Sequence, residues 1–333
     1  MKKINKRLIA LGLVGLLLLT GCGESKENTD VSKENAGSVV NGTLKPDSTV
    51  IAIGNTSVSY SEYQAYSYIL KSKYEGVVDN NIWNYSTTEG RTIGMDAIED
   101  TIRLIIQLKV IGKYAESQGV TLGADEKEEL SYDAEQYVKG LSQEIRDQYG
   151  ITTQLVAEML CDNEVARKVY DVITAKVDIN ISEEQAQVVE TQVIYLMSKG
   201  TDRNGAQVNL NDEDKTALFN KAKELQTQAQ SGGFYALAET NSSLNEIQMN
   251  IGREDTPKEL VDVAFTMKAG QISPVISTDT GFYILNCVGV NRAEAMEQHR
   301  QELIEERQTK AFQDIYKTWA DKIGVHVSRS LLK

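Results

Sequence analysis

Histidine is nearly absent from this chain of 333 residues, which contains only His299 and His326. Cysteine is also rare, and no two cysteines have the Cys-x-x-Cys spacing of zinc or redox sites. Because clustered His and Cys ligands are missing, the sequence indicates no metal site and no cofactor. Of the three cysteines, Cys161 and Cys287 are expected as buried thiols or as disulfide partners, and the pattern favours thiols.

The chain also has fewer basic than acidic residues. The chain has 35 Lys and Arg against 48 Asp and Glu, which gives a formal net charge of -13. A surface this acidic excludes nucleic acid and anionic lipid headgroups as electrostatic partners.

The first residues carry the strongest positive signal. Four basic residues precede an apolar run from Leu8 to Leu19, which is too short for a membrane-spanning helix and reads as a signal peptide over residues 1–21. Leu19-Thr20-Gly21-Cys22 is typical of a lipobox, in which Cys22 receives the lipid and becomes the new N-terminus. An ordinary signal peptide with an incidental Cys22 is the alternative. Because residues 1–21 hold four basic and no acidic residues, their removal takes the net charge from -13 to -17.

The rest of the chain divides by composition and periodicity. Residues 22–48 are polar and aperiodic, which predicts a disordered tether. A helical domain is expected over residues 49–185, opening with a short strand at Thr49–Ile53. Its main predicted helices are Ser61–Tyr74, Met95–Gln118 and Thr153–Thr174.

Residues 186–291 read as a small α/β domain. The predicted strands are 188–197, 272–276 and 282–290, and the predicted helices are 212–230, 234–239 and 257–267, with a loop at 199–211 and an irregular stretch at 240–256. Residues 292–333 return to a long helix and a short strand, which are expected to pack on the N-terminal helices. The predicted fold class is therefore α+β, a mostly helical domain with an inserted domain that holds a small antiparallel sheet.

Several segments resemble a known family. Thr191–Leu196, Phe265–Val275 and Thr278–Leu285 are similar to the first strand, the turn and the closing strand of parvulin-type prolyl isomerases. Val50–Asn55 and Ala115–Val120 resemble the N-terminal domain of SurA and PrsA. Together with the lipobox, the chain resembles PrsA/SurA-type foldase lipoproteins that carry a parvulin-type (PpiC or rotamase) peptidyl-prolyl isomerase domain.

The resemblance implies a catalyst of rotation about X–Pro bonds, but the family's site residues are replaced. Val193 and Tyr283 stand where the family has two His, Ser242 where it has Cys or Asp, and Thr256 and Leu260 where it has the Met and Phe of the proline pocket. This implies weak or lost isomerase activity. If activity remains, Tyr283, Ser242 and Thr280 are the expected catalytic residues, and Val193, Thr256 and Leu260 the substrate-binding ones.

The predicted function is a chaperone or foldase on the extracytoplasmic face of the cell membrane, anchored by lipid. Its expected partners are unfolded or partly folded secreted polypeptides, and a homodimer is left open. The alternatives are an active prolyl isomerase with an altered site and a solute-binding lipoprotein. An aromatic-rich opening segment either packs the core or lines a cleft for polypeptide; its members are Tyr60, Tyr63, Tyr66, Tyr68, Tyr74, Trp83 and Tyr85.

Overall fold

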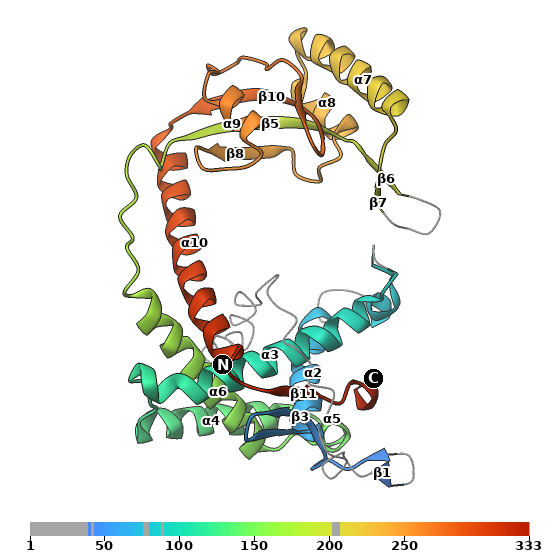
Figure 1. The fold of residues 1–333 in the computed structure, drawn as a ribbon. Coiled ribbons are helices and arrows are strands. Elements are labelled where there is room, and N and C mark those ends of the chain that lie inside the picture. Colours follow the sequence, from blue (N-terminus) through green and yellow to red (C-terminus); the bar gives the residue numbers. More distant parts are fainter. Residues whose placement is uncertain (1–38, 41–42, 76–79, 88–89, 202–206, 333) are drawn as a thin grey trace. The chain divides into compact units, whose positions relative to one another are not determined.

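The computed structural model describes residues 39–40, 43–75, 80–87, 90–201 and 207–332 (Figure 1). The signal peptide, Cys22 and most of the tether lie outside these residues. No helix in the described part of the chain is long and apolar enough to cross a bilayer. The chain forms two compact units, of which unit 1 comprises Met1–Val177 with Gln308–Lys333 and unit 2 comprises Asp178–Arg307.

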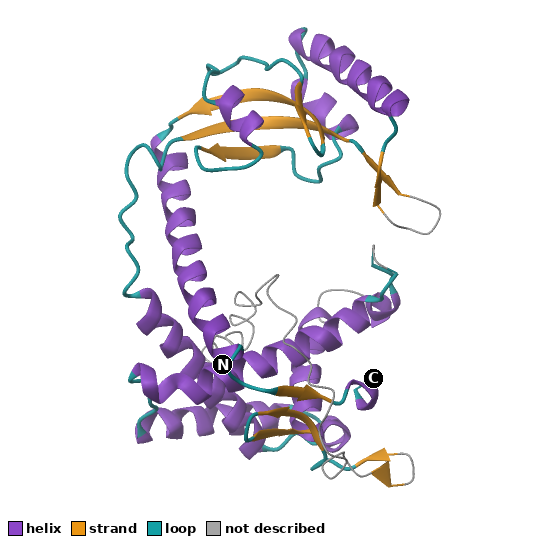
Figure 2. Cartoon of the chain, viewed as in Figure 1, coloured by secondary structure: helices purple, strands orange, loops and turns teal. Residues whose placement is uncertain are grey.

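Unit 1 is mainly helical (Figure 2). Its helices are α2 (Tyr60–Glu75), α3 (Ile93–Ala115), α4 (Ala124–Gly140), α5 (Gln143–Tyr149), α6 (Thr153–Thr174) and the C-terminal part of α10 (Ala293–Ala320), with short 3-10 turns η2 (Asn80–Asn84), η3 (Glu116–Gln118) and η4 (Arg329–Leu331). A small antiparallel sheet has the order β11 (Val325–Val327), β3 (Thr49–Ile53) and β4 (Thr56–Ser59), so the last strand of the chain pairs with the first strand of the domain. A separate hairpin joins β1 (Val39–Val40) to β2 (Thr43–Leu44).

Local chemistry sets the ends of these helices. The side chains of Thr92, Ser142 and Thr152 accept hydrogen bonds from backbone N–H groups of the first turns of α3, α5 and α6. Gly119 follows η3 with φ of 71°, a left-handed conformation that glycine adopts without strain. Helix α5 was not expected from the sequence, because its seven residues show little apolar periodicity.

The core of unit 1 joins the two ends of the chain. Ile105, Leu108 and Ile111 of α3 are fully buried. Phe312 and Trp319 of α10 lie in the same core, and Trp319 stacks on Tyr114 with ring centroids 5.0 Å apart. The C-terminal helix therefore packs against N-terminal helices within unit 1.

Unit 2 is built on an antiparallel sheet of four strands in the order β8 (Gln248–Gly252), β5 (Val188–Met197), β10 (Gly281–Val290) and β9 (Ile276–Thr278). Side chains alternate between its two faces. One face packs with α9 (Lys258–Ala264), and the other packs with α7 (Asp212–Gln230) and α8 (Phe234–Asn241). These helices and small antiparallel sheets confirm the predicted α+β class.

Four predictions for unit 2 were wrong in detail. The expected irregular stretch contains β8, and the expected loop at 199–211 contains the hairpin strands β6 (Lys199–Thr201) and β7 (Gln207–Asn209). The strand expected at 272–276 is displaced to β9, and Ile272 makes only an isolated bridge to Asn286. Pro274 has no N–H to continue this pairing, so the ladder stops at Ser273, whose N–H donates to Leu285 O at 2.8 Å. Helix α9 is also shorter than the predicted 257–267.

Candidate functional site

The two positions where the resemblance places histidine lie on one face of the unit 2 sheet. Val193 of β5 pairs with Leu285 of β10, and Tyr195 pairs with Tyr283. Because side chains two residues apart share a face, Val193 and Tyr283 are diagonal neighbours. Both belong to the apolar cluster under α9.

The cluster is closed around these positions. Val193 is 0% exposed, and Tyr283 is 9% exposed. The ring of Tyr283 stacks on that of Tyr195 with centroids 4.3 Å apart and an interplanar angle of 25°. Burial raises the pKa of Tyr283, so its hydroxyl stays protonated at neutral pH.

Tyr195 is the site residue that the sequence reasoning missed. Its hydroxyl donates to the carbonyl oxygen of Thr280 at 2.7 Å, which ties the β5 end of the site to the turn before β10. The signal was available in the alternation of β5, since a residue two positions from Val193 must share its face.

The hydroxyl of Ser242 is bonded to the backbone, and that of Thr280 to a neighbouring side chain. The Ser242 hydroxyl oxygen accepts from Tyr195 N–H at 3.1 Å and from Leu244 N–H at 3.3 Å, and the adjacent Ser243 N–H donates to Tyr195 O at 2.7 Å. Thr280 is exposed, and its Oγ1 lies 3.2 Å from that of Thr278. Ser242 therefore continues the hydrogen bonding of β5 past Gln248, the first residue of β8.

The remaining substrate-binding candidates separate. Leu260 of α9 is 3% exposed and lies in the same apolar cluster as Val193. Thr256 is exposed and precedes Pro257 through a cis peptide bond. The structure thus brings Val193, Leu260, Tyr195 and Tyr283 together and leaves Thr256 outside the cluster.

Neither histidine of the chain belongs to this cluster. His299 is buried on α10, and the Cβ of any larger residue at Gly252 would lie 2.4 Å from its Nε2. His326 lies on β11 in unit 1. Both Cys161 and Cys287 are free thiols, and Cys287 is 1% exposed with Sγ directed at Gly289 O. Within the residues that the structure covers, no three His, Cys, Asp or Glu side chains are placed to bind a metal ion.

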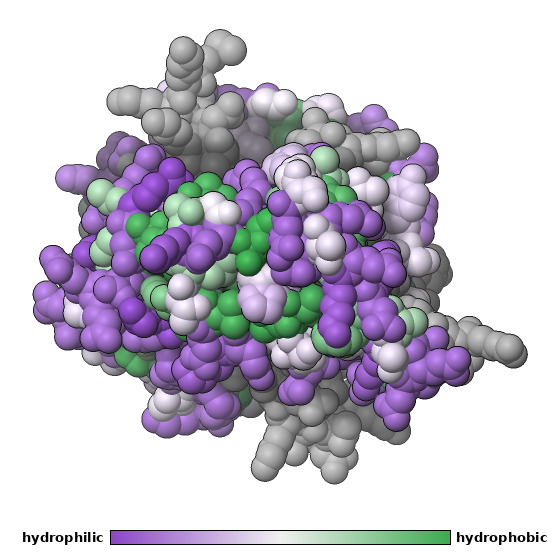
Figure 3. Space-filling model, turned by 90° about the horizontal axis from the view of Figure 1, so that it is seen from above, coloured by the Kyte–Doolittle hydropathy of each residue, from purple (hydrophilic) through white to green (hydrophobic). Residues whose placement is uncertain are grey.

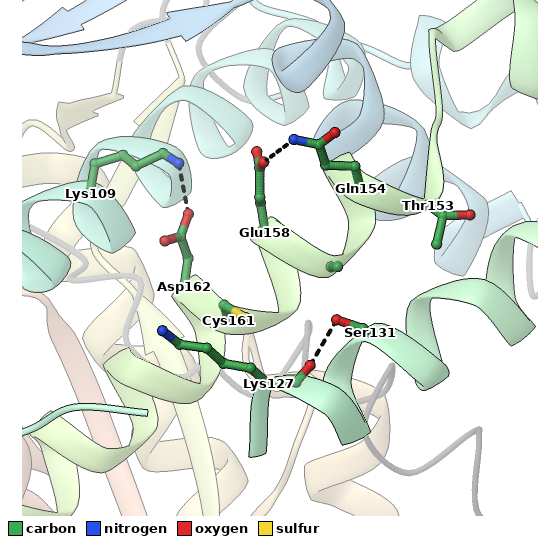
Figure 4. Close-up of a pocket in the computed structure, with 9 residues that line it drawn as sticks. Lys109, Lys127, Ser131, Thr153, Gln154, Glu158, Cys161 and Asp162 are labelled. Carbon is green, nitrogen blue, oxygen red and sulfur yellow. Dashed lines mark hydrogen bonds and ion pairs between the residues drawn. The ribbon is translucent and has the colours of Figure 1, made fainter. Parts of the chain in front are cut away.

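Unit 1 contains an open groove of about 750 Å³ between α4 and α6 (Figure 4). Its lining includes Ala157 and Cys161 of α6 and Lys127 of α4, and one end is bounded by an ionic cluster. There the Nζ atom of Lys109 lies 2.7 Å from Glu62 Oε1 and 2.7 Å from Asp162 Oδ2. Burial alone would lower the pKa of Lys109, but Asp162 and Glu62 outweigh it and raise the pKa.

Replacing Lys109 with methionine should lower the free energy of unfolding at pH 7 by about 2 kcal/mol, since two half-buried carboxylates lose their shared cation. Because its folded pKa is raised, the stabilisation by Lys109 is fully present below pH 10.5 and is lost as the pH rises through the folded value. Urea unfolding of both proteins as a function of pH measures this difference. Lys310→Met, which removes an exposed pair with Asp314, is the control and should cost under about 0.5 kcal/mol. Equal losses for the two variants would contradict the prediction.

The aromatic-rich opening segment divides between core and surface. Tyr63 and Tyr66 are buried, whereas Tyr74 and Tyr85 are 51% and 60% exposed. The ring of Trp83 meets that of Tyr74 edge-on at 6.0 Å. Tyr63 and Tyr66 therefore pack the core, and a cleft for polypeptide at the exposed members stays a prediction.

Comparison with protein families finds one match, to the Rotamase family described as a PPIC-type PPIASE domain, over residues 206–289. No curated protein matches the chain. Among solved structures, the peptidylprolyl isomerase PrsA of Bacillus anthracis is 16% identical, with 66% of this chain and 94% of that one covered and a TM-score of 0.35. The foldase protein PrsA of Streptococcus pneumoniae is 19% identical, with 64% and 79% covered and a TM-score of 0.32.

A SurA-like chaperone of Campylobacter jejuni is 11% identical, with 84% of this chain and 98% of that one covered and a TM-score of 0.31. These TM-scores are low, so the assignment rests on the family model. The matched residues include helix α9. They also include three strands of the sheet described above, namely β8, β9 and most of β10. Residues 206–289 of unit 2 therefore match the model of a PPIC-type PPIase domain.

Proposed function

We propose that the protein is a chaperone or foldase that holds non-native secreted polypeptides on the extracytoplasmic face of the membrane, anchored through lipid on Cys22. In this proposal unit 2 retains the PPIC-type fold with weak or no isomerase activity. One observation supports the weak or absent isomerase activity. The two positions where the family resemblance implies His are occupied by the fully buried Val193 and by Tyr283 stacked on Tyr195.

Catalysis requires that a proline ring can reach the site. Rotation about an X–Pro bond has a barrier of about 20 kcal/mol, and a catalyst must bind the twisted amide better than the planar one. That requires an open pocket for the proline ring next to groups that contact the amide. Here the apolar positions Val193 and Leu260 are at most 3% exposed, and the Tyr195 hydroxyl is already bonded to Thr280 O.

Exposed apolar side chains support the binding of polypeptide. Figure 3 shows a face on which apolar residues lie among hydrophilic ones. The large apolar residues most exposed in the described chain include Tyr74, Tyr85, Met95 and Tyr132 of unit 1 and Tyr235 of unit 2. Tyrosine combines an apolar ring with a polar hydroxyl, which suits contact with many sequences at low specificity.

An active isomerase with an altered site is the second candidate. The hydroxyl of Tyr283 lies beside Thr280, and two hydroxyls could contact a substrate carbonyl. A solute-binding lipoprotein is less well supported, since that class predicts two lobes of repeated βα units, whereas the main sheet of unit 2 is antiparallel.

Two assays on the purified full-length protein in detergent separate these functions. We expect suppression of the aggregation of a chemically denatured client at an equimolar ratio, and cis-to-trans isomerisation of a prolyl tetrapeptide within about two-fold of the uncatalysed rate. Fast turnover that Tyr283→Phe abolishes would establish the second candidate. Failure to suppress aggregation would remove the chaperone proposal.

A further inference from the structure

Strand β8 is one outer strand of the unit 2 sheet, and among the described strands it pairs only with β5. The direction of its backbone groups follows from the pairing. Val193 N–H donates to Ile247 O at 2.8 Å, so the backbone groups of Ile247 point toward β5. Since this direction alternates along a strand, Met249 and Ile251 also face β5, and Gln248, Asn250 and Gly252 face outward.

Side-chain contacts agree with this assignment. Thr191 Oγ1 donates to Met249 O at 2.8 Å from the β5 side. Gly252 N–H, which faces outward, donates to Asp255 Oδ2 at 2.7 Å, so that end of the edge is already capped. What remains is a row of outward N–H and C=O groups at Gln248 and Asn250, two exposed residues.

The two edge strands of the sheet differ in how well they are protected against pairing with another strand. Strand β9 has three residues and follows Pro274, both common ways to prevent pairing at an edge. Strand β8 reads Gln-Met-Asn-Ile-Gly and contains no proline, lysine or other charged residue. Folded proteins normally block such an edge because it is a template for another strand.

We propose that the outer edge of β8 binds an extended segment of a non-native polypeptide as an added strand. The backbone of Gln248 and Asn250 donates to and accepts from the backbone of the client. Backbone pairing reads no particular sequence, which fits a chaperone with many clients. This inference rests on the proposed function and assigns part of the client site to unit 2.

The charge of the chain and of β8 indicates which kind of segment binds the β8 edge. A second copy of the chain would bring another net charge of -13 to the edge, and like charges oppose such pairing. A segment of neutral or positive charge meets no such repulsion, because β8 itself is uncharged. The occupant is therefore a neutral or basic extended segment, and a second copy becomes an outcome of the test.

Proline substitution tests the edge selectively. In Asn250→Pro and Gln248→Pro the ring replaces an outward N–H and occupies the space of the incoming strand, while the bonds to β5 come from other residues. Asn250→Ala is the matched control, since it removes the side chain and keeps the backbone donor. The probe is fluorescently labelled lysozyme, reduced and carboxamidomethylated, a basic chain that stays unfolded and gains no carboxylates, titrated with the full-length protein in detergent.

We expect each proline variant to bind the probe about ten-fold more weakly and Asn250→Ala to bind within about two-fold of wild type. Amide exchange followed by NMR should show Gln248 and Asn250 protected when the probe is bound, a measurement that needs no variant. Wild-type affinity in both proline variants, or no protection at these amides, would overturn the proposal. So would a concentration-dependent dimer that the proline variants abolish, since the occupant would then be a second copy. Absence of probe binding by wild type would instead refute the chaperone function itself.

Discussion

The double variant Val193→His and Tyr283→His is expected to lose stability without gaining isomerase activity. The side chain of Val193 is 0% exposed and faces Leu285 across the sheet, so an imidazole there is buried without a hydrogen-bond partner. Burial of an unpaired polar group costs about 2–4 kcal/mol, and histidine at 283 also removes the stack on Tyr195. Urea unfolding and the prolyl tetrapeptide assay measure the two effects.

Single variants show which of the two positions accounts for the loss of stability. Tyr283→His alone replaces a partly polar ring at the edge of the cluster and should cost less than Val193→His. Val193→Thr keeps the shape of the side chain and adds one hydroxyl, so a loss of about 1–2 kcal/mol is expected. A double variant as stable as wild type, with turnover well above background, would show that the site lies close to activity and that the buried cluster opens readily.

The expected loss follows from the packing of the sheet face at these two positions. A parvulin-like sheet needs side chains at the positions of Val193 and Tyr283 whatever its activity, because this face packs against α9. In this chain an aliphatic side chain and a stacked aromatic pair fill the space. Introducing histidines alone would leave the surrounding apolar packing unchanged, which is why we expect no activity.

Long periodic elements could be predicted from the sequence nearly to the residue. Helices α6 and α7 and strand β5 have the expected bounds, since each combines a clear apolar pattern with capping or turn residues at its ends. Ser182 and Gln185 form the two reciprocal hydrogen bonds of a capping box, both of 3.1 Å, although only a turn follows.

Strand β8 could not be predicted in this way. It has five residues, and its alternate positions are polar because they face solvent. Its partner strand is about sixty residues away, as in the pair Val189 and Ile251, and no local pattern encodes that pairing. The same limit applies to Ser242, which precedes β8 in the chain. Its role as an acceptor for Tyr195 N–H depends on where β8 begins.

The resemblance predicts a site at Val193 and Tyr283, but it does not specify the side-chain interactions there. The resemblance identified Val193 and Tyr283 as neighbours, and the register of β5 and β10 places them on one face. The stack of Tyr195 on Tyr283 depends on side-chain conformations that a sequence does not specify. We expect this stack to obstruct the entry of a proline ring.

Phe312→Ala is expected to be among the most destabilising substitutions in the chain. The ring is 0% exposed, belongs to the core of unit 1 and contacts the ring of Tyr170 at 5.3 Å between centroids. Truncation of a buried Phe to Ala costs about 3–5 kcal/mol, through lost burial and the cavity that remains. Urea unfolding followed by tryptophan fluorescence reports the loss directly, because Trp319 is 6% exposed in the same core.

Two further variants test whether the effect arises from the packing of α10 on the N-terminal helices. Phe312→Leu keeps most of the apolar volume and should cost about 1–2 kcal/mol. Lys310→Ala, two residues away on the exposed side of the same helix, should change stability by under about 0.5 kcal/mol. A loss for Phe312→Ala no larger than that for Lys310→Ala would mean that residues 308–333 are not part of the folding core of unit 1. In that case the chain ends would not be joined by the helix stripe that Phe312, Ile315 and Trp319 form.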